Sequence, residues 1–244
     1  MKKTLTCSIW FFLCITAISQ TKKQDSVAIL IIDRMTDVIG DLQSCSFHLS
    51  TSNDVADTVG LVKKFANFEV YMEGPDKMLV NAHGWKGHRQ FMYHGNQLTY
   101  YSFDENNYGI LPVPDNIVAM MDSVHDMYDI DFPAADFFYP AFTDDLLENT
   151  DTVLYLGMVK IENQEYLQIL ASNKTTKYQF WINNDAYDLP AKFVITDKTK
   201  PGNPQYEASF SNWLINSDLP DAMFDFEPPP GATKLRIASK TDRE

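Results

Sequence analysis

Three histidines in the first half of the chain have the residue type and spacing from which a metal site is sometimes built. His83 and His88 flank a four-residue turn, so a hairpin would bring their rings close, and zinc binds imidazole nitrogen at about 2.0–2.1 Å. In a strand with alternating side chains, His94 points to the same face as His88, but it lies several residues further along the chain. Histidines at hairpin ends are more often solvated polar residues, so we expect no metal and no other cofactor here.

Carboxylates are concentrated in the middle of the chain. A calcium loop needs alternating oxygen ligands around a central glycine, as in D-x-[DN]-x-[DN]-G, and the sequence lacks this pattern. A pair of carboxylates would also suit glycoside hydrolysis. Solvated helix caps and faces explain these acids better, and a hydrolase with a dispersed carboxylate site stays a third hypothesis. The acids are Asp126, Asp129, Asp131, Asp136, Asp144, Asp145 and Glu148.

Other catalytic signatures are missing from the sequence. It contains no G-x-S-x-G elbow, no G-x-x-x-x-G-K-[ST] phosphate loop, no G-x-G-x-x-G, no H-E-x-x-H and no C-x-x-C. We therefore expect a protein that is not an enzyme.

Apolar side chains suggest binding instead of catalysis. Between the two groups of predicted strands lies a stretch rich in Met and Phe, which either forms ordinary core or closes over an apolar cavity, because Met and Phe adapt to ligands of varied shape. Each CH₂ buried in such a cavity contributes about 0.8 kcal/mol, which suits long apolar ligands. The candidate cavity residues are Met120, Met121, Val124, Phe137 and Phe138 from this stretch and Met78, Val80, Phe91, Tyr93, Leu98 and Tyr100 from the strands.

The charge balance excludes one class of partner. The 244 residues include 20 Lys and Arg against 33 Asp and Glu, a formal net charge of −13. Proteins that bind nucleic acid need a cationic surface, so we expect no nucleic-acid partner. The balance also disfavours electrostatic docking on anionic lipid head groups.

The first twenty residues have the order of a secretory signal peptide. Lys2 and Lys3 precede an apolar stretch over 5–18, which small and polar residues then follow. The stretch is about 14 residues long and a membrane span needs about 20, although a membrane anchor stays the alternative. We expect export to the periplasm, or secretion. Removal of the leader leaves Cys45 as the single cysteine, which cannot form an internal disulfide and which we expect to be a buried, inert thiol.

The remaining sequence predicts a mainly β (α+β) domain. Apolar residues at three-and-four spacing predict a helix over 26–43. Period-two alternation with polar turns predicts six strands and, after the insert, five more. These strands cover 47–52, 63–72, 77–83, 88–94, 97–103 and 107–111, and then 153–161, 165–171, 177–182, 191–196 and 205–213.

The insert between the two groups of strands is predicted to be helical. Asp115 is a plausible N-cap for a helix over 116–128, a second helical piece over 132–139 breaks at Pro140, and residues 143–145 cap a short turn. About eleven antiparallel strands exceed what a flat sheet tolerates, so the sheet should curl into a barrel or half-barrel with the insert as a lid on its concave side. We expect one domain over 21–238 and a frayed tail over 239–244.

Several segments resemble a family of uncharacterised predicted periplasmic proteins, the domain of unknown function 2092. The resemblance lies in residues 75–80, 91–99, 108–114 and 132–136 and, in the second half, in residues 180–182, 189–196 and 204–206 and the FDFEPP of residues 224–229. This family is similar in turn to the wider fold of LolA and LolB, a lipoprotein carrier and its receptor. The resemblance implies a curved antiparallel sheet with a helical lid around an apolar cavity, and it brings no catalytic residues.

Together these observations predict an exported binding protein, a monomer that holds a lipid, a lipoprotein acyl chain or a similar apolar ligand in the concave cavity of its sheet. The alternative is a sensor or interaction module of the cell envelope with the same fold, whose lid helices bind a protein partner.

Overall fold

The computed structural model describes residues 22–242, so the predicted signal peptide lies outside the described residues. A short strand and a helix come first, β1 (Lys23–Gln24) and α1 (Ser26–Gly40). The next six strands are β2 (Ser44–Asp57), β3 (Gly60–Glu73), β4 (Lys77–Gly84), β5 (Gly87–His94), β6 (Gln97–Ser102) and β7 (Asn107–Pro112).

The second half begins with the helical insert, continues with five long strands and closes with three short elements. The insert comprises α2 (Ile117–Tyr128), the 3-10 helix η1 (Ala135–Phe138) and α3 (Phe142–Asn149). The strands are β8 (Thr152–Ile161), β9 (Gln164–Ser172), β10 (Thr176–Asn183), β11 (Pro190–Asp197) and β12 (Gln205–Ile215), and the chain closes with η2 (Asp221–Met223), β13 (Thr233–Lys234) and η3 (Lys240–Asp242).

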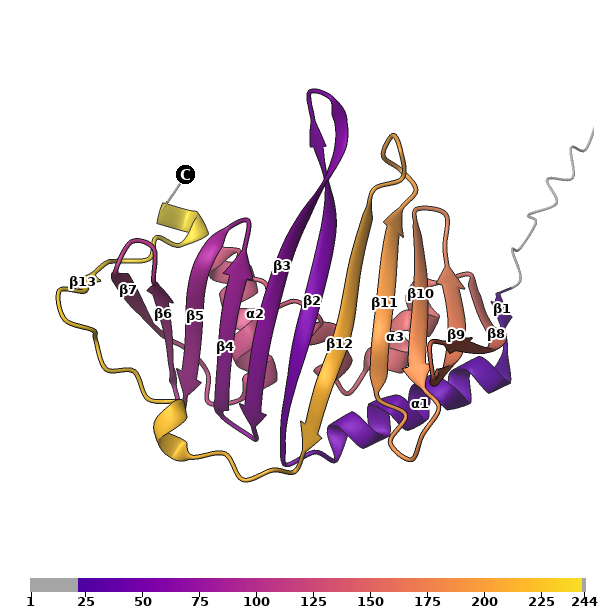
Figure 1. Cartoon of the computed structure of the whole chain (residues 1–244), viewed down its shortest axis with the longest axis horizontal. Helices are drawn as coiled ribbons and strands as arrows, with labels where there is room; N and C mark the ends of the chain where they lie inside the picture. The colour runs from indigo at the N-terminus through magenta and orange to yellow at the C-terminus, as the bar shows by residue number, and fades with distance from the viewer. Residues whose placement is uncertain (1–21, 243–244) are drawn as a thin grey trace, which may run out of the picture.

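All the strands belong to one open, curved sheet in the order β1-β8-β9-β10-β11-β12-β2-β3-β4-β5-β6-β7-β13 (Figure 1). The two predicted groups of strands meet where β12 pairs with β2 in antiparallel fashion, Phe210 opposite Leu49. The prediction of a mainly β domain with a curved sheet is confirmed, but residues 22–242 form thirteen strands instead of about eleven. The two extra strands, β1 and β13, are parallel edge strands of two residues each, too short to show any period.

All three α-helices cover the same face of the sheet (Figure 1). The helix α1 buries the stripe that contains Ala28, Ile32 and Met35, and α2 buries Met120 and Val124. These side chains and the inward-facing strand residues form the main core. Among residues 22–242, no helix combines the length and the hydropathy that a bilayer crossing requires.

The helix boundaries differ from the predicted ones at several points. The first helix ends at Gly40, because the chain turns there to enter β2 at Ser44. The N-cap of α2 is Asn116 and not Asp115, since the Asn116 side chain accepts hydrogen bonds from the amides of Val118 and Ala119 at 3.0 and 3.3 Å.

The second half of the insert is also arranged differently. Only Ala135–Phe138 of the predicted piece over 132–139 is helical, as a single 3-10 turn. Residues 143–145 do not cap α3 but lie within its first turn, because the helix already begins at Phe142. The Thr143 hydroxyl is 3.3 Å from the hydroxyl of Thr36, a contact that ties α3 to α1.

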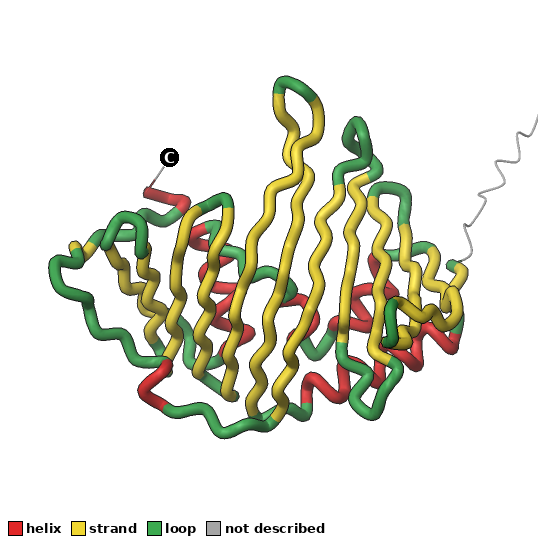
Figure 2. Tube along the Cα trace, in the orientation of Figure 1, coloured by secondary structure: helices red, strands yellow, loops and turns green. Residues whose placement is uncertain are grey.

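Residues 216–242, which we call the C-terminal strap, wrap around one end of the sheet (Figure 2). Phe224 is 1% exposed and packs on Leu79, Met92 and Tyr101, on the face opposite the helices. The strand β13, which is part of the strap, then pairs with β7. Beyond it the strap returns to the helical side of the sheet, where Lys240 Nζ lies 2.8 Å from the carboxylate of Asp129. The first residues of the predicted frayed tail thus form η3.

Candidate functional site

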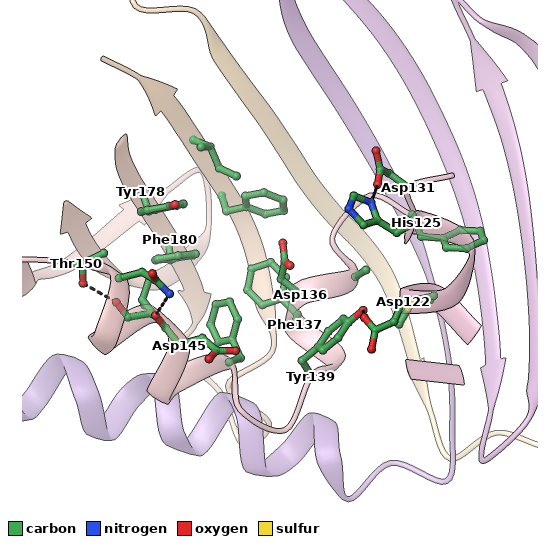
Figure 3. A pocket seen from close by; sticks show the side chains of 18 of the residues that line it. Asp122, His125, Asp131, Asp136, Phe137, Tyr139, Asp145, Thr150, Tyr178 and Phe180 are labelled. Carbon is green, nitrogen blue, oxygen red and sulfur yellow. Dashed lines mark hydrogen bonds and ion pairs between the residues drawn. The ribbon is translucent and has the colours of Figure 1, made fainter. Parts of the chain in front are cut away.

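A cavity of about 730 Å³ lies between the helical insert and the concave face of β10 and β11 (Figure 3). Its volume is within the range of about 300–1,000 Å³ of small-molecule sites. It is lined by Met121, Asp122, His125, Ile130, Asp131, Phe132, Ala135, Asp136, Phe137, Tyr139, Phe142, Asp145, Leu146, Asn149, Thr150, Asn173, Tyr178, Phe180, Phe193 and Ile195.

Aromatic rings form the apolar side of this cavity. Phe137 of η1 is 3% exposed, and its ring centroid lies 5.0 Å from that of Phe142 and 5.2 Å from that of Phe193. Phe180 lies 6.1 Å from Phe142 and stacks with Tyr178 at 6.3 Å. Rings from the insert and from two strands therefore meet around one space, where an apolar ligand would lose its contact with water.

Carboxylates form the polar side. His125 Nδ1 lies 2.6 Å from Asp131, and the Tyr139 hydroxyl donates a hydrogen bond to Asp122 at 2.7 Å. Figure 3 shows the carboxylate of Asp136 between these pairs and the aromatic group of Tyr178 and Phe180. Burial, with the negative charges of Asp131 and Asp145, raises the pKa of Asp136 above its usual range.

Two of the eleven predicted cavity residues line this cavity, and these two also belong to the main core. Met121 and Phe137 line the cavity, and the other nine do not. Seven of these nine belong to the main core or pack against it beside α2, because α2 fills the concave side of β4–β6. These residues are Met78, Val80, Phe91, Tyr93, Leu98, Met120 and Val124.

The last two predicted residues lie at the margins of that core. Phe138 packs against it and stacks on Phe47 at 5.9 Å, and Tyr100 contacts Phe91 at 5.4 Å. The sequence-based prediction missed the strand residues that do line the cavity, above all Phe180, Phe193 and Ile195. Their alternation within 177–182 and 191–196 was visible as a signal for an inward face.

A second hollow of about 860 Å³ lies between the β2–β3 hairpin and the loop that joins β11 to β12. Leu61, Pro201 and Tyr206 are among the residues that line it, and Ile195 lines both hollows. Ile195 of β11 therefore lies between the two hollows.

The histidines form no common site within the described residues. His83 and His88 lie edge to face at 5.2 Å, and His88 stacks on Phe103 at 3.9 Å. His94 is at the opposite end of β5, where its Nδ1 lies 2.8 Å from Asp225. Across residues 22–242 no group of three or more His, Cys, Asp or Glu side chains has the arrangement of a metal site.

The cysteine of the described chain is buried, as predicted. Cys45 is 3% exposed at the start of β2, and burial raises the pKa of its thiol to about 12. The thiolate is the reactive form of cysteine, so this side chain is an inert part of the core at neutral pH.

Comparison with solved structures finds one alignment that supports a similar fold, with weaker alignments beside it, all at low sequence identity. An uncharacterized conserved protein from Thermus thermophilus aligns with a TM-score of 0.50 and 13% identity, over 86% of this chain and 99% of that chain. A LolA superfamily protein from Nitrosomonas europaea gives 0.37 and 12%, over 82% and 97%. The lipoprotein LppX from Mycobacterium tuberculosis gives 0.45 and 13%, over 80% and 98%.

Comparison with family models confirms the resemblance noted in the sequence. No curated protein matches the chain. The model described as predicted periplasmic protein (DUF2092) matches residues 28–238, nearly all of the described chain. That description agrees with the exported, periplasmic localisation predicted from the leader. The chain therefore belongs to the DUF2092 family of predicted periplasmic proteins.

Proposed function

We propose that this chain is a non-enzymatic binding protein of the periplasm that holds the apolar part of a lipid or lipopeptide between its helical insert and β10–β11. The observation that carries the proposal is the cavity of about 730 Å³ with Phe137, Phe142, Phe180 and Phe193 around it. An alkyl chain enclosed there leaves water without any need for directional contacts, at about 0.8 kcal/mol for each buried CH₂.

The insert has the position of a lid over this space. Its three helical segments and the residues that connect them provide most of the lining, whereas the sheet contributes residues of β10, β11 and the turn before β10. Asp122 and Tyr139 bridge the two halves of the insert beside the cavity. A ligand would therefore enter by displacing insert segments while the hydrogen-bonded strands stay in place.

Native mass spectrometry of the protein purified from its own envelope without detergent tests the proposal. We expect a reproducible added mass of lipid size. In the variant Ala135→Leu a larger side chain occupies the cavity and the added mass should fall severalfold. Ala222→Leu, on the exposed part of the strap, is the matched control and should keep it.

Two results would overturn the proposal. One is an apo mass for the native protein that persists after incubation with single-chain amphiphiles. The other is an equal loss of bound mass in both alanine variants, which would place the ligand elsewhere. A protein partner that stays bound after removal of lipid would favour the sensor or interaction module instead.

A further inference from the structure

The cavity has a marked charge asymmetry. Four aspartates line it, and neither Lys nor Arg is among the lining residues. His125 is the one histidine among the lining residues, and it already pairs with Asp131 at 2.6 Å. The space is therefore apolar on one side and anionic on the other.

Two of the four carboxylates have no partner among residues 22–242. Asp122 accepts the hydrogen bond from Tyr139, and Asp131 pairs with His125. In the described part of the chain, no hydrogen bond or ion pair reaches the carboxylates of Asp136 and Asp145. Both line the cavity, so their oxygens are available to a bound group.

Asp136 has the less favourable environment of the two. The residue is exposed to the cavity, yet desolvation by the surrounding side chains and the charges of Asp131 and Asp145 disfavour its charged form. Nearby, the buried hydroxyl of Tyr206 has no hydrogen-bond partner within the described range. A cation beside Asp136 would relieve the repulsion among these carboxylates, whereas an anion would add to it.

The aromatic lining favours the same kind of ligand group. A quaternary ammonium is attracted to the faces of Tyr and Phe rings within about 6 Å, and aromatic rings with carboxylates are a common setting for it. In this cavity the carboxylate of Asp136 points into the space that separates Tyr178 and Phe180 from His125 and Asp131 (Figure 3).

We propose that the cavity selects amphiphiles with a cationic head group, whose alkyl chain lies among the phenylalanines and whose head lies beside Asp136 and Asp145. This inference rests on the proposed function and adds the charge of the ligand to it. An amphiphile of the same chain length with an anionic head is rejected, because its charge would lie next to like charges without a partner.

Binding of three probes that share a ten-carbon alkyl chain tests the inference: decyltrimethylammonium, decanol and decanesulfonate. The two charged heads keep their charge at every pH used, and concentrations stay below those at which circular dichroism detects unfolding. By calorimetry near neutral pH we expect the cation to bind at least about tenfold more tightly than the anion, with the alcohol between them.

Charge variants separate the cavity from the overall acidity of the chain. In the double variant Asp136→Asn, Asp145→Asn, the affinities for the cation and the anion should differ by no more than about twofold. The matched control, Asp41→Asn with Asp218→Asn, makes the same change in net charge at two exposed positions and should keep the preference for the cation.

The outcomes distinguish the two proposals. Equal affinity for the three probes, or a preference for decanesulfonate, overturns the inference and leaves the proposed function in place. Equal effects of the two double variants also overturn it, because the preference would then come from net charge. Failure of all three probes to bind overturns the proposed function together with the inference.

Discussion

The Tyr139 hydroxyl donates a hydrogen bond to Oδ1 of Asp122 at 2.7 Å, and this bond joins the segment after η1 to the helix α2 across the rim of the cavity. Burial, with the nearby negative charge of Asp122, raises the pKa of Tyr139, so the hydroxyl stays protonated and able to donate well above neutral pH. The insert is thus held by a polar contact as well as by its apolar core.

Replacing Tyr139 by Phe removes this contact and little else. A hydrogen bond of this kind contributes about 1 kcal/mol, so Tyr139→Phe should lower the free energy of unfolding in urea by about that amount. Tyr187→Phe is the control, since Tyr187 is 52% exposed. If both substitutions lowered the free energy of unfolding equally, the Tyr139–Asp122 hydrogen bond would not specifically stabilise the insert.

Phe137 joins the insert to the sheet. Its ring centroid lies 5.0, 5.2 and 5.6 Å from those of Phe142, Phe193 and Phe210. Removing a buried phenylalanine ring costs about 3–5 kcal/mol, so Phe137→Ala should lower the unfolding midpoint strongly. Phe65→Ala, at a position that is 62% exposed, should change stability by less than about 1 kcal/mol.

The raised pKa of Asp136 has a consequence for stability as a function of pH. The folded state binds the Asp136 proton more tightly than the unfolded state, so stability falls as pH rises from the ordinary carboxyl pKa through the raised one. Asp136→Asn should therefore be more stable than the native protein at neutral pH. The difference should shrink as pH falls below the ordinary pKa of aspartate.

Thermal unfolding of both proteins, from below the ordinary carboxyl pKa to above neutral pH, measures this difference. Other titratable groups also line the cavity, namely Asp131, Asp145, Asp122 and His125, and they are present in both proteins. A difference that stays constant over the whole range would contradict the prediction.

Cys45 offers a test of the core. A thiol with a pKa of about 12 is almost entirely protonated in mildly alkaline buffer and is shielded from reagents as well. We expect the chain from residue 21 onward to leave Ellman's reagent unreacted in buffer and to release one equivalent of product in concentrated urea. Fast reaction of the folded protein would show that the start of β2 opens readily.

The close approach of the C-terminal strap to β7 gives a further test. A Cβ at Gly109 would lie 2.5 Å from the side chain of Ile237, too near for both to keep their places. Gly109→Ala should destabilise the domain by about 1–3 kcal/mol. Ile237→Ala in the same chain should relieve part of this cost, and strictly additive effects would contradict the contact.

Much of the fold could be predicted from the sequence, for a local reason. Period-two alternation and polar turns mark each long strand, so the eleven long strands appear in the expected order. The exact helix ends could not be predicted in this way. Asp115 and Asn116 are both good capping residues, and only the extended backbone of Asn116, at φ −141° and ψ 136°, selects between them.

The position of the cavity depends on relationships that no local pattern contains. The pairing of β12 with β2 connects residues far apart in the sequence and decides which strands face which part of the insert. The phase of α2 then buries Met120, Met121 and Val124 in the core, and of these three Met121 also lines the cavity. The sequence therefore pointed to apolar side chains of the insert, but not to the strands or the carboxylates that also line the cavity.

The route of the C-terminal strap has a consequence for the time at which this protein can fold. Phe224 and Ile237 complete the packing of strands made much earlier in the chain, and β12 must dock on β2 before the sheet is continuous. Such distant pairings form late in folding. A chain that crosses a membrane from its N-terminus onward therefore cannot complete its packing until its last residues leave the translocation channel. Until then it stays in the extended form that passage through the channel requires.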